Sequence, residues 1–188
     1  MILADAIASL ESQFKVLAKT EFRGQTSLTV ERALIADLCA VAKNQLGFDL
    51  LANLCSVDNF GQEPRFEVVY ELYSVTDNHY LRLKVAVSED ELEVPTVSGV
   101  WGGADWLERE VYDMMGIRFG GHPDLRRILM WEGYPYHPLR KDFPLAGLPS
   151  EVPGVAFTRV TPIEGGPFVT TPGACGAKER EPRSKQLE

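Results

Sequence analysis

Cysteine is scarce in this sequence, and its placement argues against two common kinds of site. The chain holds three cysteines, Cys39, Cys55 and Cys175, with no C-x-x-C pair and no neighbouring histidine. An iron–sulfur cluster generally takes four cysteine ligands, and a structural zinc takes four cysteine or histidine ligands. The sequence therefore predicts a chain that holds neither a cluster nor a metal ion of its own.

Nucleotide loops and membrane spans are also missing. No glycine pair lies in a G-x-G-x-x-G pattern, and neither a G-x-x-x-x-G-K-[ST] loop nor a G-x-S-x-G elbow occurs. No stretch approaches the roughly 20 apolar residues of a membrane helix. Residues 1–14 carry acidic and no basic residues, unlike a signal or transit peptide. We expect a protein that stays where it is made, in a bacterial cytoplasm.

Basic residues are too few for general nucleic-acid binding. The chain has 19 Lys and Arg against 27 Asp and Glu, a net charge of −8, whereas binding to phosphates relies on a cationic surplus. The balance is uneven, because residues 1–117 carry 9 cations and 19 anions and residues 118–188 carry 10 and 8. The acidic part is expected to form the body of the protein, and the remainder to have a different role.

The apolar pattern predicts helices and an antiparallel sheet. Helical spacing covers residues 3–14 and 31–46, and a third helix is predicted at 104–115, before Gly116. Strands are predicted at 16–17, 27–30, 48–57, 66–75 and 80–87, the last two as a hairpin. The order of these elements predicts an α+β fold with helices packed on one face of a mainly antiparallel sheet.

Proline and glycine accumulate towards the C-terminus. Ten of the 12 prolines and ten of the 16 glycines lie from Gly116 onward, where they oppose long helices and paired central strands. We therefore divide the chain into an α+β domain, 1–116, and an extended arm and tail, 117–188, that docks to a partner. Apolar residues of the arm, such as Phe119 and Met130, are expected to need another protein's surface.

Charged residues are dense on the third predicted helix and just after it. Arg109 and Asp113 stand four apart and can pair, while Glu108 and Glu110 are expected to face outward or sideways. Carboxylates with His122 could in principle suit a metal ion or general acid–base chemistry. Glycines separate this histidine from the helix, and no second histidine is in range, so a protein interface is the better interpretation.

The order of these residues matches the signature of a known family. The matching elements are Glu108-Arg109-Glu110, Asp113-Met114-Met115, His122, Arg126, Ile128-Leu129, and then His137-Pro138-Leu139-Arg140-Lys141-Asp142-Phe143-Pro144-Leu145. In these two motifs the chain resembles the 30-kDa (C) subunits of respiratory NADH:quinone oxidoreductase. One departure is Tyr134-Pro135-Tyr136, where the family pattern leads us to expect a histidine instead.

The resemblance implies a cofactor-free core subunit of the peripheral arm of that proton-translocating enzyme. Such a subunit sits against the quinone-reducing D subunit and near the iron–sulfur B subunit. Electrons pass from NADH through FMN and Fe-S clusters of the partner subunits to quinone, and the isolated chain catalyses nothing. The resemblance also implies a peripheral place at the cytoplasmic face of the inner membrane, reached only through the complex.

The resemblance further implies which residues dock to the partners. These expected docking residues are Glu108, Arg109, Glu110, Asp113, His122, Arg126, Arg127, His137, Arg140, Lys141 and Asp142. One alternative is an accessory subunit of a related membrane-bound hydrogenase. A more distant alternative is a free-standing small enzyme that uses the carboxylate cluster.

Overall fold

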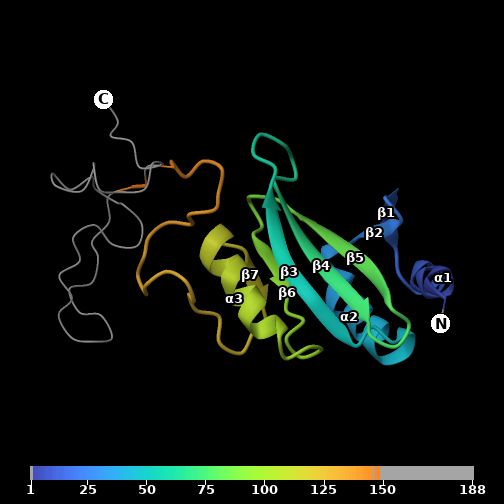
Figure 1. Ribbon diagram of the computed structural model, residues 1–188. Coiled ribbons are helices and arrows are strands. Elements are labelled where there is room, and N and C mark those ends of the chain that lie inside the picture. Colours follow the sequence, from blue (N-terminus) through green and yellow to red (C-terminus); the bar gives the residue numbers. More distant parts are fainter. Residues whose placement is uncertain (1, 146, 149–188) are drawn as a thin grey trace.

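The order of helices and strands follows the sequence pattern. The computed structural model describes residues 2–145 and 147–148. Its elements are α1 (Leu3–Gln13), β1 (Val16–Phe22), β2 (Gln25–Val30), the 3-10 turn η1 (Arg32–Leu34), α2 (Ile35–Leu46), β3 (Leu50–Asp58), β4 (Phe66–Ser74), β5 (His79–Val87), β6 (Glu93–Pro95), α3 (Ala104–Met115) and β7 (Arg118–Gly120) (Figure 1). In these ranges no helix is both long and apolar enough to cross a membrane.

The main sheet is mixed, with mostly antiparallel pairs. Its strand order is β1-β2-β5-β4-β3, and only the central β2–β5 pair is parallel. The predicted hairpin is present as β4 and β5, paired from Phe66 opposite Val87 to Ser74 opposite His79. A second, two-stranded sheet pairs β6 with β7 in parallel. This small sheet connects the chain before α3 with the chain after it.

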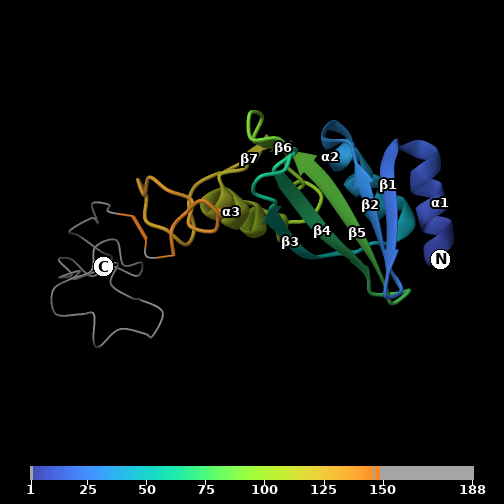
Figure 2. The ribbon, with the colours of Figure 1, turned by 90° about the horizontal axis from the view of Figure 1, so that it is seen from above.

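The two faces of the main sheet differ in polarity. Leu28, Leu81 and Leu83 have no exposed surface and belong to one continuous core with α1 and α2. On the opposite face, ion pairs join neighbouring strands, including Lys84 to Glu67 at 2.8 Å. Figure 2 shows α1 and α2 at the β1–β2 end of the sheet and α3 beyond β3. The predicted α+β fold class is confirmed.

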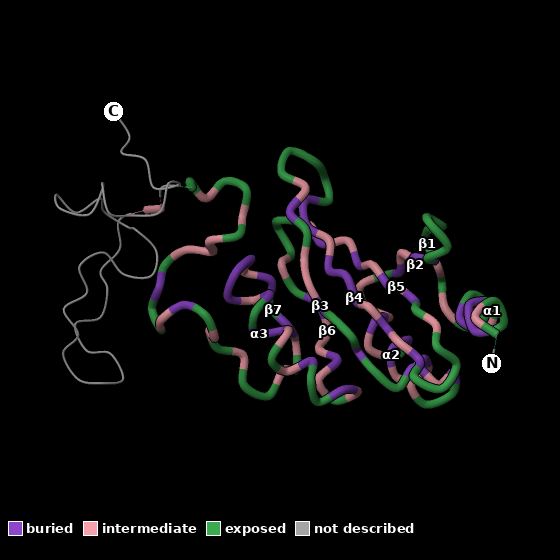
Figure 3. Tube along the Cα trace, viewed as in Figure 1, coloured by how far each residue is buried: buried purple, intermediate pink, exposed green. Residues whose placement is uncertain are grey.

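The chain after α3 folds back onto the body. Ile117, Phe119, Met130 and Tyr134 are 0, 2, 5 and 2% exposed and join the core, and Figure 3 shows the buried positions along α3. Our expectation that such residues need another protein's surface is wrong for Phe119, Met130 and Tyr134, because they pack against their own chain. The division at residue 116 stays a prediction. Residues 149–188, including Cys175, lie outside the described residues.

Both α2 and α3 end at a glycine in the left-handed conformation. Gly47 has φ 75° and Gly116 has φ 80°, a backbone region that glycine enters at little cost. Their surroundings differ. A Cβ on Gly47 would lie 3.9 Å from Asp77 Oδ2, whereas a Cβ on Gly116 would lie 2.5 Å from Arg140 Nη2 and 2.7 Å from His137 Nε2. Gly116 is therefore needed for its conformation and for a close approach.

Alanine at these two positions should separate the two effects. Gly47→Ala should lower the free energy of unfolding by about 1–2 kcal/mol through left-handed strain. Gly116→Ala should lower it by roughly 1–3 kcal/mol more, because the side chains over Gly116 must also move. Urea unfolding of both variants measures the difference. Equal losses would show that the close approach contributes nothing.

Candidate functional site

The carboxylate of Asp113 lies at the centre of the signature residues. It has no exposed surface, and its Oδ2 accepts hydrogen bonds from the N–H groups of Ile128, Leu129 and Met130 at 3.0, 2.7 and 2.8 Å. Its Oδ1 accepts a hydrogen bond of 2.6 Å from Arg127 Nη1. A buried charge is tolerated when it is paired and fully hydrogen-bonded. Asp113 thus fixes the following loop against α3.

Arg109 reaches the same loop from one turn earlier in α3. Its Nε and Nη2 donate to the carbonyl oxygens of Arg126 at 3.2 Å and Arg127 at 3.1 Å. Its guanidinium carbon lies 5.1 Å from the centre of the Trp106 ring, within the range of a cation–π contact. The predicted pairing of Arg109 with Asp113 is replaced by these contacts, because each side chain binds the loop instead.

The C-terminal end of α3 is capped by residues that come later in the chain. A helix leaves its last carbonyls without partners inside the helix. The carbonyl of Asp113 accepts from Arg127 Nη1 at 3.1 Å and from His137 Nδ1 at 2.9 Å. The carbonyl of Met114 accepts from the N–H of Leu139 at 3.2 Å, and that of Met115 accepts from Arg140 Nε at 2.7 Å. The arginines also place positive charge at the negative end of the helix dipole.

We call the side chains that join α3 to this later segment the α3 clamp: Arg109, Asp113, Arg127, His137 and Arg140. Burial holds the pKa of His137 below its usual value, and the nearby Arg140 and Arg127 act in the same direction. Because its partner is a carbonyl, Nδ1 of His137 must be the donor. The ring therefore contributes a neutral hydrogen bond to the clamp.

Glu108, the residue before Arg109 on α3, faces inward. Our prediction that it faces outward or sideways is wrong, since it has no exposed surface. Its Oε1 accepts from the N–H of Val97 at 2.7 Å, and its Oε2 accepts from Thr96 Oγ1 at 2.5 Å. Burial raises the pKa of this carboxyl, although the bonds from Thr96 and Val97 oppose the shift. Glu108 therefore connects α3 with the loop after β6.

His122 is buried beside the same helix. Its side chain has no exposed surface, and Nε2 lies 2.9 Å from Asp105 Oδ1 and 3.8 Å from Glu108 Oε2. Nδ1 accepts a hydrogen bond of 3.0 Å from the N–H of Asp124, so the ring proton lies on Nε2. Among the residues that the structure describes, no group of three His, Cys, Asp or Glu side chains is arranged to hold a metal ion.

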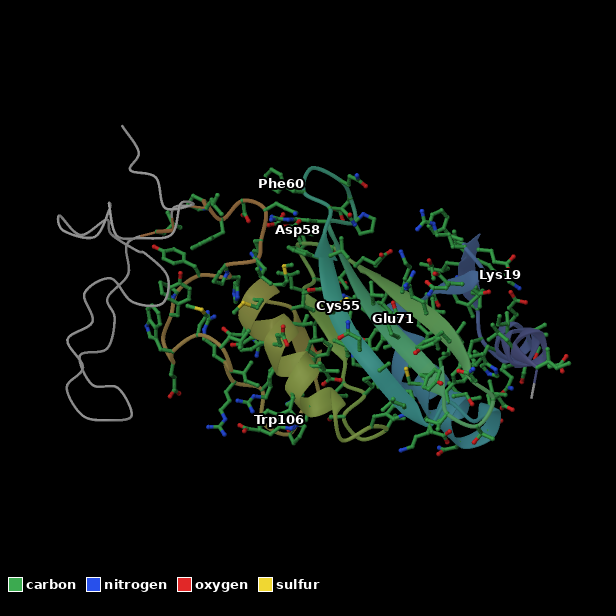
Figure 4. All side chains as sticks on the ribbon, viewed as in Figure 1. Lys19, Cys55, Asp58, Phe60, Glu71 and Trp106 are labelled. Carbon is green, nitrogen blue, oxygen red and sulfur yellow. The ribbon has the colours of Figure 1, made fainter. Side chains whose placement is uncertain are left out.

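A second buried cluster joins the segment after the clamp to the turn between β3 and β4, where Figure 4 labels Asp58. The side chains of Asp58 and Arg65 are 0 and 5% exposed and share two hydrogen bonds of 2.9 Å. Asp58 also accepts from the N–H of Lys141 at 2.8 Å, and Arg65 bonds Asp142 Oδ1 at 2.9 Å. These bonds anchor the chain at 141–142.

Sequence reasoning missed Asp58 and Arg65, because both lie in a segment interpreted only as strand end and turn. A usable signal was present. In the sequence, an acidic and a basic residue flank a predicted turn between two strands. In the structure, the register of these strands sets Asp58 opposite Phe66, next to Arg65. The hydrogen bond from Arg65 is the main cause that lowers the pKa of Asp58.

The expected docking residues are therefore divided between two settings. Four of them keep exposed positions: Glu110, Arg126, Lys141 and Asp142. Of these, Arg126 bonds Asp124 at 2.8 Å and has a side chain 68% exposed. The others are mostly withdrawn from solvent and bond within the chain. Their role in docking stays a prediction.

Comparison with known proteins gives one consistent family. The profile of the family described as respiratory-chain NADH dehydrogenase, 30 Kd subunit, matches residues 28–149. The C subunit of the NADH-quinone oxidoreductase of Geobacter sulfurreducens is 48% identical over 145 residues, which cover 76% of this chain and 90% of the relative.

Solved structures agree at the level of the fold. The trypsin-resistant fragment (1-134) of Nqo5 has a TM-score of 0.59 and 32% identity, covering 66% of this chain and 100% of the fragment. A chain of an archaeal respiratory membrane complex, the membrane-bound sulfane sulfur reductase, has a TM-score of 0.65 at 23% identity. It covers 75% of this chain and 85% of its own length. The second likeness concerns the fold alone.

Replacing the central carboxylate should release the loop. Asp113→Asn should lower the free energy of unfolding by about 3–5 kcal/mol, because Arg127 would keep its buried charge without a counter-ion. The amides of Leu129 and Met130 should lose protection from hydrogen exchange. Asp124→Asn, which removes an exposed pair, should cost about 0–1 kcal/mol. Unchanged protection in Asp113→Asn would mean that other contacts hold the loop.

The Asp58 cluster should make stability depend on pH in the acidic range. The pKa of Asp58 lies below its ordinary 3.8 in the folded chain, so the unfolded chain takes up the proton first. The stability that Asp58 contributes is therefore complete above that value and is lost as the pH falls through the lower, folded pKa. Urea midpoints from about pH 7 to about pH 3 should fall less in Asp58→Asn than in the wild type. Asp37→Asn, on an exposed turn of α2, should keep the wild-type profile.

Proposed function

Because the chain belongs to the family of 30-kDa subunits of respiratory-chain NADH dehydrogenase, we propose that it is a cofactor-free core subunit of that enzyme's peripheral arm. In this proposal it docks against the quinone-reducing D subunit and the iron–sulfur B subunit. Electrons then pass from NADH through FMN and Fe-S clusters in the partners to quinone. The chain reaches the cytoplasmic face of the inner membrane only through the complex.

The observation that carries the proposal is that the family's charged residues are buried and form hydrogen bonds within this chain. Asp113 and Glu108 have no exposed surface and are hydrogen-bonded. Arg109 donates its hydrogen bonds to two loop carbonyls. A general acid or base must come within hydrogen-bond reach of a substrate. Residues buried in this way fit a structural role that shapes the surface for docking, and they give no support to a free-standing enzyme.

The hydrogenase alternative is not favoured. The relatives matched at close to half identity, such as the one from Geobacter sulfurreducens at 48%, are named as C subunits of NADH-quinone oxidoreductase.

The proposal that flavin and clusters lie in partner subunits draws on the three scattered cysteines of this chain. It predicts that the purified chain is colourless, and stoichiometric iron or flavin in that protein would contradict it.

The direct test is assembly of the complex in cells of the source bacterium. In cells that lack this chain, the quinone-reducing and iron–sulfur subunits should no longer copurify with flavin-containing subunits through a tag. Expression of the full chain should restore both the complex and its NADH:quinone activity. A complex that assembles and turns over normally without the chain would refute the proposal.

Two arginine variants separate the effect of the α3 clamp on stability from the effect of docking on assembly. Arg140→Ala removes a hydrogen bond to Met115 O and a contact over the Phe66 ring, so the isolated chain should lose about 1–3 kcal/mol of stability. Arg126→Ala should leave that stability within about 1 kcal/mol. It should still reduce the assembled complex, since losing one partner of a desolvated interfacial pair costs roughly 2–5 kcal/mol.

Native gels with flavin-normalised turnover measure both effects. The complex that forms with Arg126→Ala should keep near-normal turnover per flavin, because the residue positions the subunit and touches no reacting group. Full assembly with lost turnover would instead place Arg126 in the chemistry.

A further inference from the structure

Three large apolar side chains stay exposed on α3 and on the segment bound to it. Trp106, Leu129 and Leu139 are 58, 59 and 57% exposed. Single exposed apolar residues are common on protein surfaces and need no explanation. These three differ because residues of the α3 clamp and the end of α3 hold each of them in place.

One cation–π contact and two backbone hydrogen bonds attach these three residues to α3. Trp106 lies under the guanidinium of Arg109 at 5.1 Å, the N–H of Leu129 is bound by Asp113, and the N–H of Leu139 is bound by the carbonyl of Met114. Their attachment points thus run from position 106 to position 114 of α3, about 12 Å along the helix. We call Trp106, Leu129 and Leu139 the α3 ridge.

The ridge is presented by a fixed backbone and lies away from the sheet. Figure 4 labels Trp106 at the first turn of α3, beyond β3, and far from the hairpin that carries Lys19. Figure 1 shows the chain after α3 running along the side of the helix opposite the main sheet. A surface held in one conformation loses little conformational entropy when a partner binds it.

Cations border the ridge. The Nη groups of Arg126, next to Leu129, and the ammonium of Lys141, next to Leu139, make no hydrogen bond or ion pair with the described part of the chain. Exposed carboxylates are also present: Asp124 pairs with Arg126, Asp142 pairs with Arg65, and Glu110 lies on α3. Residues 1–117 carry a net charge of −10, so most of that domain would repel a partner surface that carries carboxylates. Arg126 and Lys141 would instead attract such a surface to the ridge.

We propose that the α3 ridge is the apolar centre by which this chain docks to another subunit of its enzyme, onto an apolar surface bordered by carboxylates. This inference rests on the proposed function and assigns the energetic centre of docking to apolar residues. Interface centres are typically apolar and depleted in charge, with the polar groups at the rim. The charged signature residues act indirectly, because they hold the ridge in position.

The test uses the full chain in the complex. Leu129→Asp and Leu139→Asp should each reduce the amount of complex recovered on a tagged flavin-containing subunit by about tenfold or more, since a carboxylate would then face a desolvated, acid-bordered surface. Val75→Asp is the matched control, because Val75 is 62% exposed in the β4–β5 turn. It should assemble as the wild type does.

Measurements on the isolated full chain complete the test. Urea midpoints and sedimentation mass of Leu129→Asp should equal those of the wild type. A lower midpoint would mean that the chain's own C-terminal residues cover the ridge, and a change in mass would mean that a second copy does; either result overturns the proposal. Normal assembly of both ridge variants also overturns it. Failure of the wild-type chain to join the complex would instead refute the proposed function.

Discussion

The burial of the Asp113 carboxylate is the interaction on which the chain after α3 depends. A charge removed from water is costly unless every lone pair finds a donor. Here three consecutive loop N–H groups and the guanidinium of Arg127 supply the donors. The same bonds fix the loop, since three successive amides can point at one oxygen only in a narrow range of backbone conformations. The same hydrogen bonds therefore stabilise the buried charge of Asp113 and fix the position of the loop.

A second anchor extends that constraint. Beyond the α3 clamp, Lys141 N and Asp142 are held by the buried Asp58–Arg65 pair at the far end of β3. The segment is therefore fixed at both ends, at the C-terminus of α3 and at the β3–β4 turn. Between these anchors, its proline and glycine residues need no regular secondary structure to hold a defined path. Gly116 permits the close passage of the segment over the helix end.

These anchors change how the family's charged residues relate to function. A signature rich in Glu, Arg and Asp suggests a charged interface or an active site when it is considered alone. In the folded chain Glu108, Arg109 and Asp113 are buried and bond internally, whereas Trp106, Leu129 and Leu139 stay exposed. The family is that of a subunit of a larger enzyme. In the docking that we propose, buried ion pairs set the shape of the surface and apolar contacts supply the affinity.

The sequence by itself determined the three helices, the strands of the main sheet, the fold class and the family, but it did not predict β6 and β7. Apolar periodicity placed α3 at 104–115 with its observed bounds, because a helix repeats its own buried face and glycine marks its end. Tertiary structure decided which charges meet. Arg109 and Asp113 have the spacing of a helical pair, yet both bind a loop 14 or more residues later. Asp58 and Lys141 are 83 residues apart. A charged group that packing removes from water must bind whichever donors or acceptors lie next to it in the folded chain. Those neighbours are set by tertiary structure and not by spacing in the sequence.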